Sequence, residues 1–177
     1  MDPIFLIGYR CTGKTSTGKY LAGLLNRTFL DTDLVLESNC GTSIAQMVDQ
    51  HGWPYFRAKE TETLMNLDLK SAPVIATGGG IILAEKNRRF LKTNGIVVYL
   101  YATASVLTQR IRKDKNNTER RPDLTNDSLA LETEKMLEIR TPLYRKLAQI
   151  SINTEENSSQ AAALQIIAEI ERRYGKQ

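Results

Sequence analysis

A glycine-rich segment near the start of the chain has the residue types needed to bind phosphate. Gly8 to Thr15 form the pattern G-x-x-x-x-G-K-T, directly after the apolar run Ile4 to Ile7. The bounding glycines let consecutive backbone N–H groups converge on phosphate oxygens, Lys14 adds a cation, and the Thr15 hydroxyl can bind Mg²⁺. An incidental lysine in a strand-to-helix turn is the alternative, but strand, loop and helix follow in the required order. We therefore predict a nucleoside triphosphate site.

Two carboxylates follow the next strand-like run. Asp31 and Asp33 come directly after Phe29-Leu30. Asp31 is placed to hold Mg²⁺ beside Thr15, directly or through water. If the segment stays extended, Asp33 points to the same side and could accept a proton or hydrogen bond from an attacking hydroxyl. The alternative is that the acids cap the N-terminus of a helix, a position that aspartate favours.

Two further features suit a ligand site. Gly78, Gly79 and Gly80 follow the apolar run Val74-Ile75-Ala76, where they form either a flexible turn or a place for a ligand to approach the backbone. Arg57 and Glu60 are three residues apart on an expected helix, so they can pair on one face. A surface ion pair worth roughly 0–1 kcal/mol is the alternative for this pair.

Short apolar runs alternate with helical periodicity along the chain. We expect strands near 4–7, 74–76, 96–100 and 150–152, and a short strand that begins at Phe29 and ends in the carboxylates Asp31 and Asp33. The expected helices cover about 14–25, 43–50, 54–69, 84–93 and 128–148, together with one that begins at Thr103 and carries Arg110 and one that includes Ala163 to Tyr174.

This alternation predicts an α/β fold. Strands that are apolar on both faces favour a parallel five-stranded sheet covered by helices on both sides, a three-layer α/β/α arrangement. In such sheets ligands bind at the carboxyl ends of the strands. We therefore expect 8–15, 31–33 and 78–80, each of which follows a strand, to line one crevice. The whole chain, 1–177, is expected to form a single domain.

Composition excludes several classes of function. The 177 residues are 41% hydrophobic, and no stretch is long and apolar enough to cross a membrane. The net charge of +4 is concentrated between Arg110 and Asp123, where no aromatic residues are present to stack on bases, so we expect small anions rather than nucleic acid. A single histidine leaves no Ser-His-Asp set. Cys11 and Cys40 predict no disulfide, and we expect a cytoplasmic protein.

Six separated motifs, in order and spacing, resemble those of the shikimate kinase family. They are Gly8 to Thr15, Asp31-Thr32-Asp33, Phe56-Arg57-x-x-Glu60, Ala76-Thr77-Gly78-Gly79-Gly80, Arg121-Pro122 and Arg140-x-Pro142-Leu143-Tyr144. The resemblance implies the P-loop fold of nucleoside monophosphate kinases, with substrate-binding helices over about 33–69 and a mobile lid over about 112–126. It implies ATP and shikimate as substrates, Mg²⁺ as cofactor, and a place in chorismate and aromatic amino-acid biosynthesis.

The resemblance also implies roles for individual residues. ATP would bind Gly8, Cys11, Thr12, Gly13, Lys14, Thr15, Ser16, Arg110 and Arg121, with the metal at Thr15 and Asp31. Shikimate would bind Asp33, Arg57, Glu60, Gly78, Gly79, Gly80 and Arg140. Lys14, Asp33 and Arg121 would be catalytic: Arg121 reaches the phosphates from the lid and Asp33 binds the attacking hydroxyl. For Arg110 the alternative is an ordinary solvated residue on a helix. For Arg140 the alternative is a cation that is favoured near the end of a helix.

Two departures from the family pattern affect the nucleotide site. Cys11 stands where the family usually has another glycine, and a side chain there restricts the backbone. Glu155 and Glu156 occupy a loop where some relatives place an arginine against the adenine. Adenine contacts in that loop are therefore not carried over.

Three functions are compatible with these residues. A shikimate kinase requires a carboxylated polyol held by Arg57 and Arg140. A related kinase, for gluconate or a nucleoside monophosphate, would keep the phosphate loop and lid without needing both arginines and the glycine turn. A nucleotide-dependent switch would hydrolyse ATP slowly whatever acceptor is present. In each case we expect a monomer.

Overall fold

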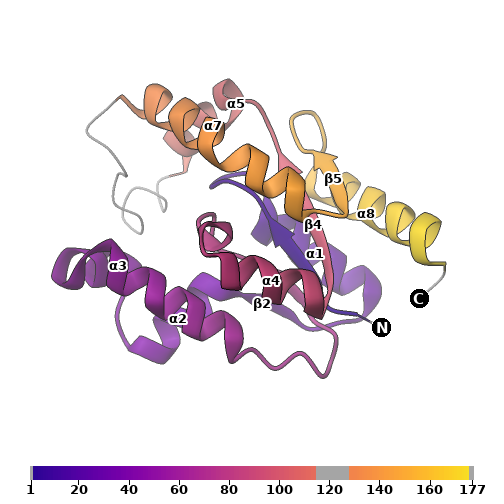
Figure 1. The fold of residues 1–177 in the computed structure, drawn as a ribbon. Helices are drawn as coiled ribbons and strands as arrows, with labels where there is room; N and C mark the ends of the chain where they lie inside the picture. Colours follow the sequence, from indigo (N-terminus) through magenta and orange to yellow (C-terminus); the bar gives the residue numbers. More distant parts are fainter. Residues whose placement is uncertain (1, 115–127, 176–177) are drawn as a thin grey trace.

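Parallel strands form the central sheet, and helices cover both of its faces (Figure 1). The computed structural model describes residues 2–114 and 128–175. Within these residues the sheet has five strands in the order β2-β3-β1-β4-β5, and every neighbouring pair is parallel. The strands are β1 (Ile4–Ile7), β2 (Phe29–Asp31), β3 (Val74–Ala76), β4 (Ile96–Tyr101) and β5 (Ile150–Asn153).

The helices alternate with these strands along the chain. They are α1 (Lys14–Leu25), α2 (Thr32–Cys40), α3 (Ile44–Met65), a 3₁₀ turn η1 (Ile81–Leu83), α4 (Glu85–Asn94), α5 (Ala104–Lys113), α7 (Leu129–Leu147) and α8 (Ser159–Tyr174). In Figure 1, α2 and α3 lie at the lower left and α7 lies above them. No helix in the described ranges is long and apolar enough to span a membrane.

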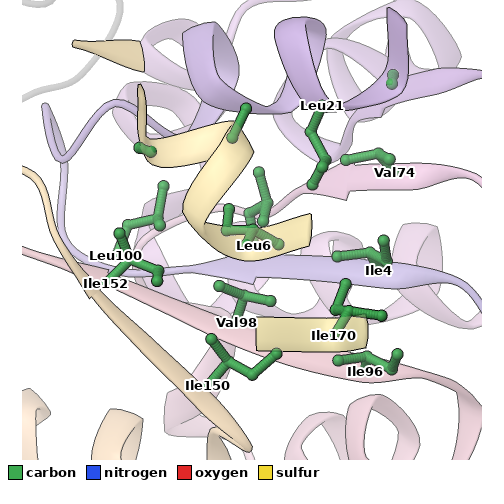
Figure 2. Packing of buried hydrophobic residues seen from close by; sticks show 14 residues of the cluster. Ile4, Leu6, Leu21, Val74, Ile96, Val98, Leu100, Ile150, Ile152 and Ile170 are labelled. Atoms are coloured by element: carbon green, nitrogen blue, oxygen red, sulfur yellow. The ribbon is translucent and has the colours of Figure 1, made fainter. Parts of the chain in front are cut away.

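Alternating side chains of the buried strands build a core on each face of the sheet. Ile4 and Leu6 of β1 point toward α1 and α8, and pack with residues such as Leu21 and Ile170 (Figure 2). Phe5 and Ile7 point to the opposite face, where α3, α4 and α7 cover them. The three central strands β1, β3 and β4 are apolar throughout and covered on both faces, which confirms the predicted three-layer α/β fold.

The carboxyl ends of β1, β2 and β3 are level with one another. Ala76 at the end of β3 pairs with Leu6 of β1 on one side and with Asp31 of β2 on the other. The three loops that follow these strands therefore begin at the same edge of the sheet. This register confirms that 8–15, 31–33 and 78–80 lie at one edge of the sheet, as predicted.

Two element predictions in the region 31–69 were wrong. The chain does not stay extended after Asp31 but turns at once into α2, because the Asp31 side chain caps that helix by accepting the backbone N–H of Asp33 at 3.1 Å. The helix expected to reach Leu69 ends at Met65, and the Asp68 side chain accepts the N–H of Lys70 in a local turn that competes with helix.

Other boundaries were closer to expectation. The helix predicted over 43–50 begins with a capping box between Ser43 and Gln46, and Gly52 adopts φ 77° at a kink inside α3, just beyond the predicted end of that helix. The predicted lid over 112–126 overlaps the end of α5 by two residues, and nearly all of the remainder, including Arg121, lies outside the described residues.

Candidate active site

The phosphate loop is shaped by glycines and held by its own lysine. A Cβ atom on Gly8 would collide with the carbonyl of Leu100, so only glycine fits there, and Gly13 has a φ of 88° at the start of α1. The Lys14 ammonium donates to the carbonyls of Gly8 at 2.9 Å and Tyr9 at 2.7 Å. Lys14 therefore lies over the loop, where a nucleotide phosphate would meet it.

Thr12 and Ser16 complete the loop. The Thr12 hydroxyl donates to the carbonyl of Tyr9 at 2.9 Å, which fixes the turn. Ser16, in the first turn of α1, lines an open cavity together with Lys14 and Thr15. The residues predicted for the phosphates thus converge on the N-terminus of a helix, which favours anions.

Cys11 lies in the left-handed region of backbone conformation, with a φ of 59°. Its thiol donates to the Asp114 carboxylate at 3.8 Å, which joins the phosphate loop to the end of α5. The left-handed conformation costs a residue with a side chain about 1–2 kcal/mol. Cys11 therefore adopts the backbone conformation that the usual glycine would adopt, at a cost in stability.

Cys11→Gly is expected to raise the free energy of unfolding by roughly 0.5–1 kcal/mol. Removing the side chain relieves the left-handed strain, while the greater freedom of glycine in the unfolded chain takes back part of the gain. Urea unfolding measures the change. Cys11→Ala is the matched control, because it removes the thiol and keeps the strain, and it should not stabilise. A lower urea midpoint for Cys11→Gly would show that the contact with Asp114 outweighs the strain.

Asp31 has two partners that together suit a metal site. One carboxylate oxygen caps α2, and the other, Oδ2, accepts the Thr15 hydroxyl at 2.8 Å. The capping alternative is therefore correct for Asp31, but it leaves Oδ2 beside Thr15 at the edge of the phosphate cavity. A hydroxyl and a carboxylate are the oxygen ligands that Mg²⁺ takes in nucleotide sites, so these residues fit the ion.

Asp33 reaches the crevice from a helix rather than from an extended strand end. It lies in the first turn of α2 and lines both the phosphate cavity and a second cavity beside it. A Cβ atom on Gly78 would lie 2.8 Å from Asp33 Oδ1 and 2.6 Å from Glu60 Oε1. The expected location of Asp33 is thus correct, although the expected backbone was wrong.

The second cavity is partly open to solvent and small, with about 50 Å³ of space for water-sized molecules. Arg57, Arg140 and the turn Gly78–Gly80 line it, together with Trp53 and Phe56. Phe56 is buried in a small cluster with α2 and the start of α3, and Trp53 packs against that cluster. The cavity therefore combines aromatic and cationic side chains, with the Arg57 guanidinium 5.4 Å and 4.8 Å from the centroids of the Trp53 and Phe56 rings.

Glu60 holds Arg57 in place. Arg57 Nη1 donates to Glu60 Oε2 at 2.7 Å, and Glu60 is 2% exposed, so this is not the surface ion pair of the alternative interpretation. Burial raises the pKa of the Glu60 carboxyl, and the charge of Arg57 opposes that rise. A Cβ atom on Gly80 would collide with the Arg57 guanidinium, so the glycine permits this close approach.

Arg140 approaches the cavity from α7. It is buried, with its guanidinium 5.6 Å from the centroid of the Tyr9 ring and Nη1 3.5 Å from the carbonyl of Gly79. The Tyr144 hydroxyl donates to the same carbonyl. A buried cation aimed at a cavity is not the helix-end cation of the alternative interpretation. Two guanidinium groups therefore face one cavity, an arrangement that suits a carboxylate.

Arg110 lies on the far side of the phosphate loop. It donates to the carbonyl of Cys11 at 3.4 Å and to the Thr154 hydroxyl at 3.3 Å, so it is not simply a solvated helix residue. Arg110, Cys11, Thr154 and Asn157 line a third cavity. The Glu155 carbonyl accepts from Arg110 at 3.3 Å, and its carboxylate accepts the N–H of Thr103.

Several residues at these cavities were not predicted from sequence. Tyr9 and Arg10 line the second cavity, Asp114 lines the phosphate cavity, and Thr154 and Asn157 line the third. Tyr9 and Arg10 occupy variable positions of the phosphate-loop pattern, so their types carry no signal. Asp114 follows α5, and Thr154 and Asn157 follow β5. These segments are distant from the phosphate loop in sequence and approach it only in the folded chain.

A parallel sheet whose phosphate loop opens onto a second, cation-lined cavity places the protein among the P-loop kinases, as an ATP-dependent enzyme that phosphorylates an alcohol group of a small molecule. The particular family follows from comparison with known proteins. Residues 10–171 match the shikimate kinase family, and the chain belongs to that family.

Individual relatives agree with this assignment. The chain is 47% identical over 159 residues to shikimate kinase 2 of Escherichia coli, a match that covers 90% of each protein. Among solved structures, a shikimate kinase from Acinetobacter baumannii in complex with shikimate has a TM-score of 0.92 and 39% identity, covering 99% of this chain and 96% of that one. The shikimate kinase from Aquifex aeolicus has a TM-score of 0.82 and 31% identity, covering 98% and 99%.

Proposed function

We propose that the protein transfers the γ-phosphoryl group of ATP to the 3-hydroxyl of shikimate, giving ADP and shikimate 3-phosphate for chorismate and aromatic amino-acid biosynthesis. The observation that carries this proposal is the pair Arg57 and Arg140 on one cavity, with Asp33 shared between that cavity and the phosphate cavity. The arginines hold the carboxylate of the acceptor, and this sets its hydroxyl against Asp33. Membership of the family supports the same substrate.

Transfer requires positioning and charge neutralisation more than covalent chemistry. Lys14 lies where the β and γ phosphates bind, and the N-terminus of α1 adds its partial positive charge. Asp33 accepts the hydrogen bond, and then the proton, of the attacking hydroxyl. Arg121, in the sequence of the proposed lid, adds charge to the phosphates and the lid excludes water, which favours transfer over hydrolysis.

The metal and nucleotide residues complete the proposal. Thr15 and Asp31 would hold Mg²⁺, which when bound neutralises phosphate charge. Gly8, Cys11, Thr12, Gly13 and Ser16 form the phosphate-binding backbone, and Arg110 flanks the adenine from the third cavity. A cytoplasmic monomer fits this role.

Arg57→Lys is expected to raise the KM for shikimate by roughly 10- to 100-fold and to change kcat little. Lysine keeps the charge but cannot make two parallel bonds to a carboxylate, and bonds to charged groups are worth about 1.5–3 kcal/mol. Steady-state kinetics with varied shikimate and saturating ATP measures both constants. Arg89→Lys, on the exposed side of α4, is the matched control and should behave as wild type. An unchanged KM would assign Arg57 a structural role only.

The acceptor is tested by measuring ADP release from ATP and Mg²⁺ with shikimate, gluconate or AMP. We expect strong stimulation by shikimate alone. Stimulation by gluconate or AMP instead would retain the kinase and overturn the substrate site built on Arg57 and Arg140. Slow release unaffected by all three would indicate a nucleotide-dependent switch.

A further inference from the structure

A buried ion pair joins the phosphate loop to α7. Arg10 Nη2 lies 2.6 Å from Glu132 Oε1, and the two side chains are 7% and 1% exposed. They are 122 residues apart in the sequence. Charges removed from water need close partners, so breaking this contact would cost free energy at both side chains. The pair therefore fixes α7 to the loop.

Arg10 stands between the two sites. Arg10 lines both the phosphate cavity and the cavity of Arg57 and Arg140. The backbone carbonyl of the preceding residue, Tyr9, accepts a hydrogen bond from the Lys14 ammonium at 2.7 Å. Any change in Lys14 on phosphate binding therefore acts on the carbonyl directly before Arg10.

Glu132 belongs to the same helix as Arg140. The two are eight residues apart on α7, or about 12 Å along a rigid helix. The Tyr9 ring lies beside both cations, with the guanidinium carbons of Arg10 and Arg140 at 5.7 Å and 5.6 Å from its centroid. A shift of the loop at Tyr9 and Arg10 is therefore transmitted to Arg140 by two contacts, through the ring and along the helix.

We propose that the Arg10–Glu132 ion pair is a positioning element that couples the two sites, so that a nucleotide in the phosphate loop sets Arg140 for the carboxylate of the acceptor. The inference rests on the proposed function, because it takes shikimate as the acceptor. Such coupling is reciprocal and typically amounts to 5- to 150-fold in affinity.

The chain carries its own reporter for the test. Trp53 is its single tryptophan, and the Arg57 guanidinium lies 5.4 Å from its ring. Shikimate titrations followed by tryptophan fluorescence, with and without saturating ADP and Mg²⁺, give the ratio of the two Kd values. For the wild type we expect ADP to lower the Kd for shikimate at least about fivefold.

The variant Arg10→Met/Glu132→Leu removes both charges together and retains apolar volume, since a single substitution would strand a buried charge. We expect it to bind shikimate with the same Kd whether or not ADP is present, whatever its Kd for shikimate alone. If it does not fold, Glu132→Gln keeps the shape of the side chain and is expected to reduce the coupling severalfold. The control Arg172→Met/Glu169→Leu removes an exposed pair on α8 and should retain full coupling.

Two results would overturn the inference while leaving the proposed function intact. One is a wild type that binds shikimate equally with and without ADP. The other is full coupling in the folded double variant or, if that variant does not fold, in Glu132→Gln. Failure of the wild type to bind shikimate under either condition would instead overturn the proposed function, and the inference with it.

Discussion

Lys14→Ala is expected to lower kcat by roughly 10³-fold or more. The substitution removes positive charge from the transferring phosphoryl group, whose neutralisation is the main catalytic task in this chemistry, and arginine fingers set the scale of such losses. The Lys14 ammonium lies within 2.9 Å of two loop carbonyls, so its charge lies at the phosphate loop. Single-turnover measurement of ADP formation at saturating substrates isolates this step.

The same hydrogen bonds complicate the interpretation, because Lys14→Ala also removes two contacts that hold the loop. Lys14→Gln retains a donor for these carbonyls without the charge, and it should be as inactive as Lys14→Ala while unfolding closer to the wild type. Lys19→Ala is the matched control, since Lys19 lines the same cavity from the surface of α1. Wild-type turnover in Lys14→Gln would remove the charge of this residue from the mechanism.

Asp33→Asn is expected to lower kcat by roughly 10²- to 10⁴-fold, the range for loss of a general base. Asparagine has the size of aspartate and keeps one oxygen toward Gly78, but it cannot accept the proton of the attacking hydroxyl. The KM for shikimate should change less than kcat, because the carboxylate of the substrate is held by Arg57 and Arg140.

Glu37→Gln is the control for Asp33→Asn. Glu37 lies on the same helix and lines the phosphate cavity, where its Oε1 accepts the N–H of Ile44, a bond that glutamine can also make. Wild-type kinetics are expected for it. A kcat for Asp33→Asn within threefold of the wild type would show that the hydroxyl loses its proton without help from this carboxylate.

The phosphate loop could be predicted because its chemistry is local. Gly8, Gly13, Lys14 and Thr15 act through backbone N–H groups and side chains that are neighbours in sequence, so their spacing carries the geometry. The meeting of three loops was also predictable, since parallel strands bring their carboxyl ends to one edge. The alternation of strands and helices in the sequence was therefore enough to predict that these loops meet.

The path of the chain at Asp31 could not be predicted with the same rule. Aspartate at a strand end can continue an extended segment or cap a helix, and here the cap is formed while a second carboxylate oxygen remains for Thr15. Asp33 reaches the crevice by either path. The site was therefore located correctly through a wrong local conformation.

Contacts between distant segments carry no sequence signal. Gly80 is required by the guanidinium of Arg57, and Arg10 is neutralised by Glu132, but neither relation follows from spacing. Cys11 is the converse case. Its position in the pattern indicated a restricted backbone, and its left-handed φ confirms that restriction.

The central claim is that the γ-phosphoryl group is delivered to the 3-hydroxyl of shikimate. Phosphorus NMR of a reaction with ATP, Mg²⁺ and shikimate tests it directly, because a new phosphomonoester couples to the proton on the carbon that bears it. We predict one new phosphomonoester signal, coupled to the proton at carbon 3 and formed in step with ADP. Inorganic phosphate as the only new product, or a phosphoryl group on another hydroxyl, would contradict the account.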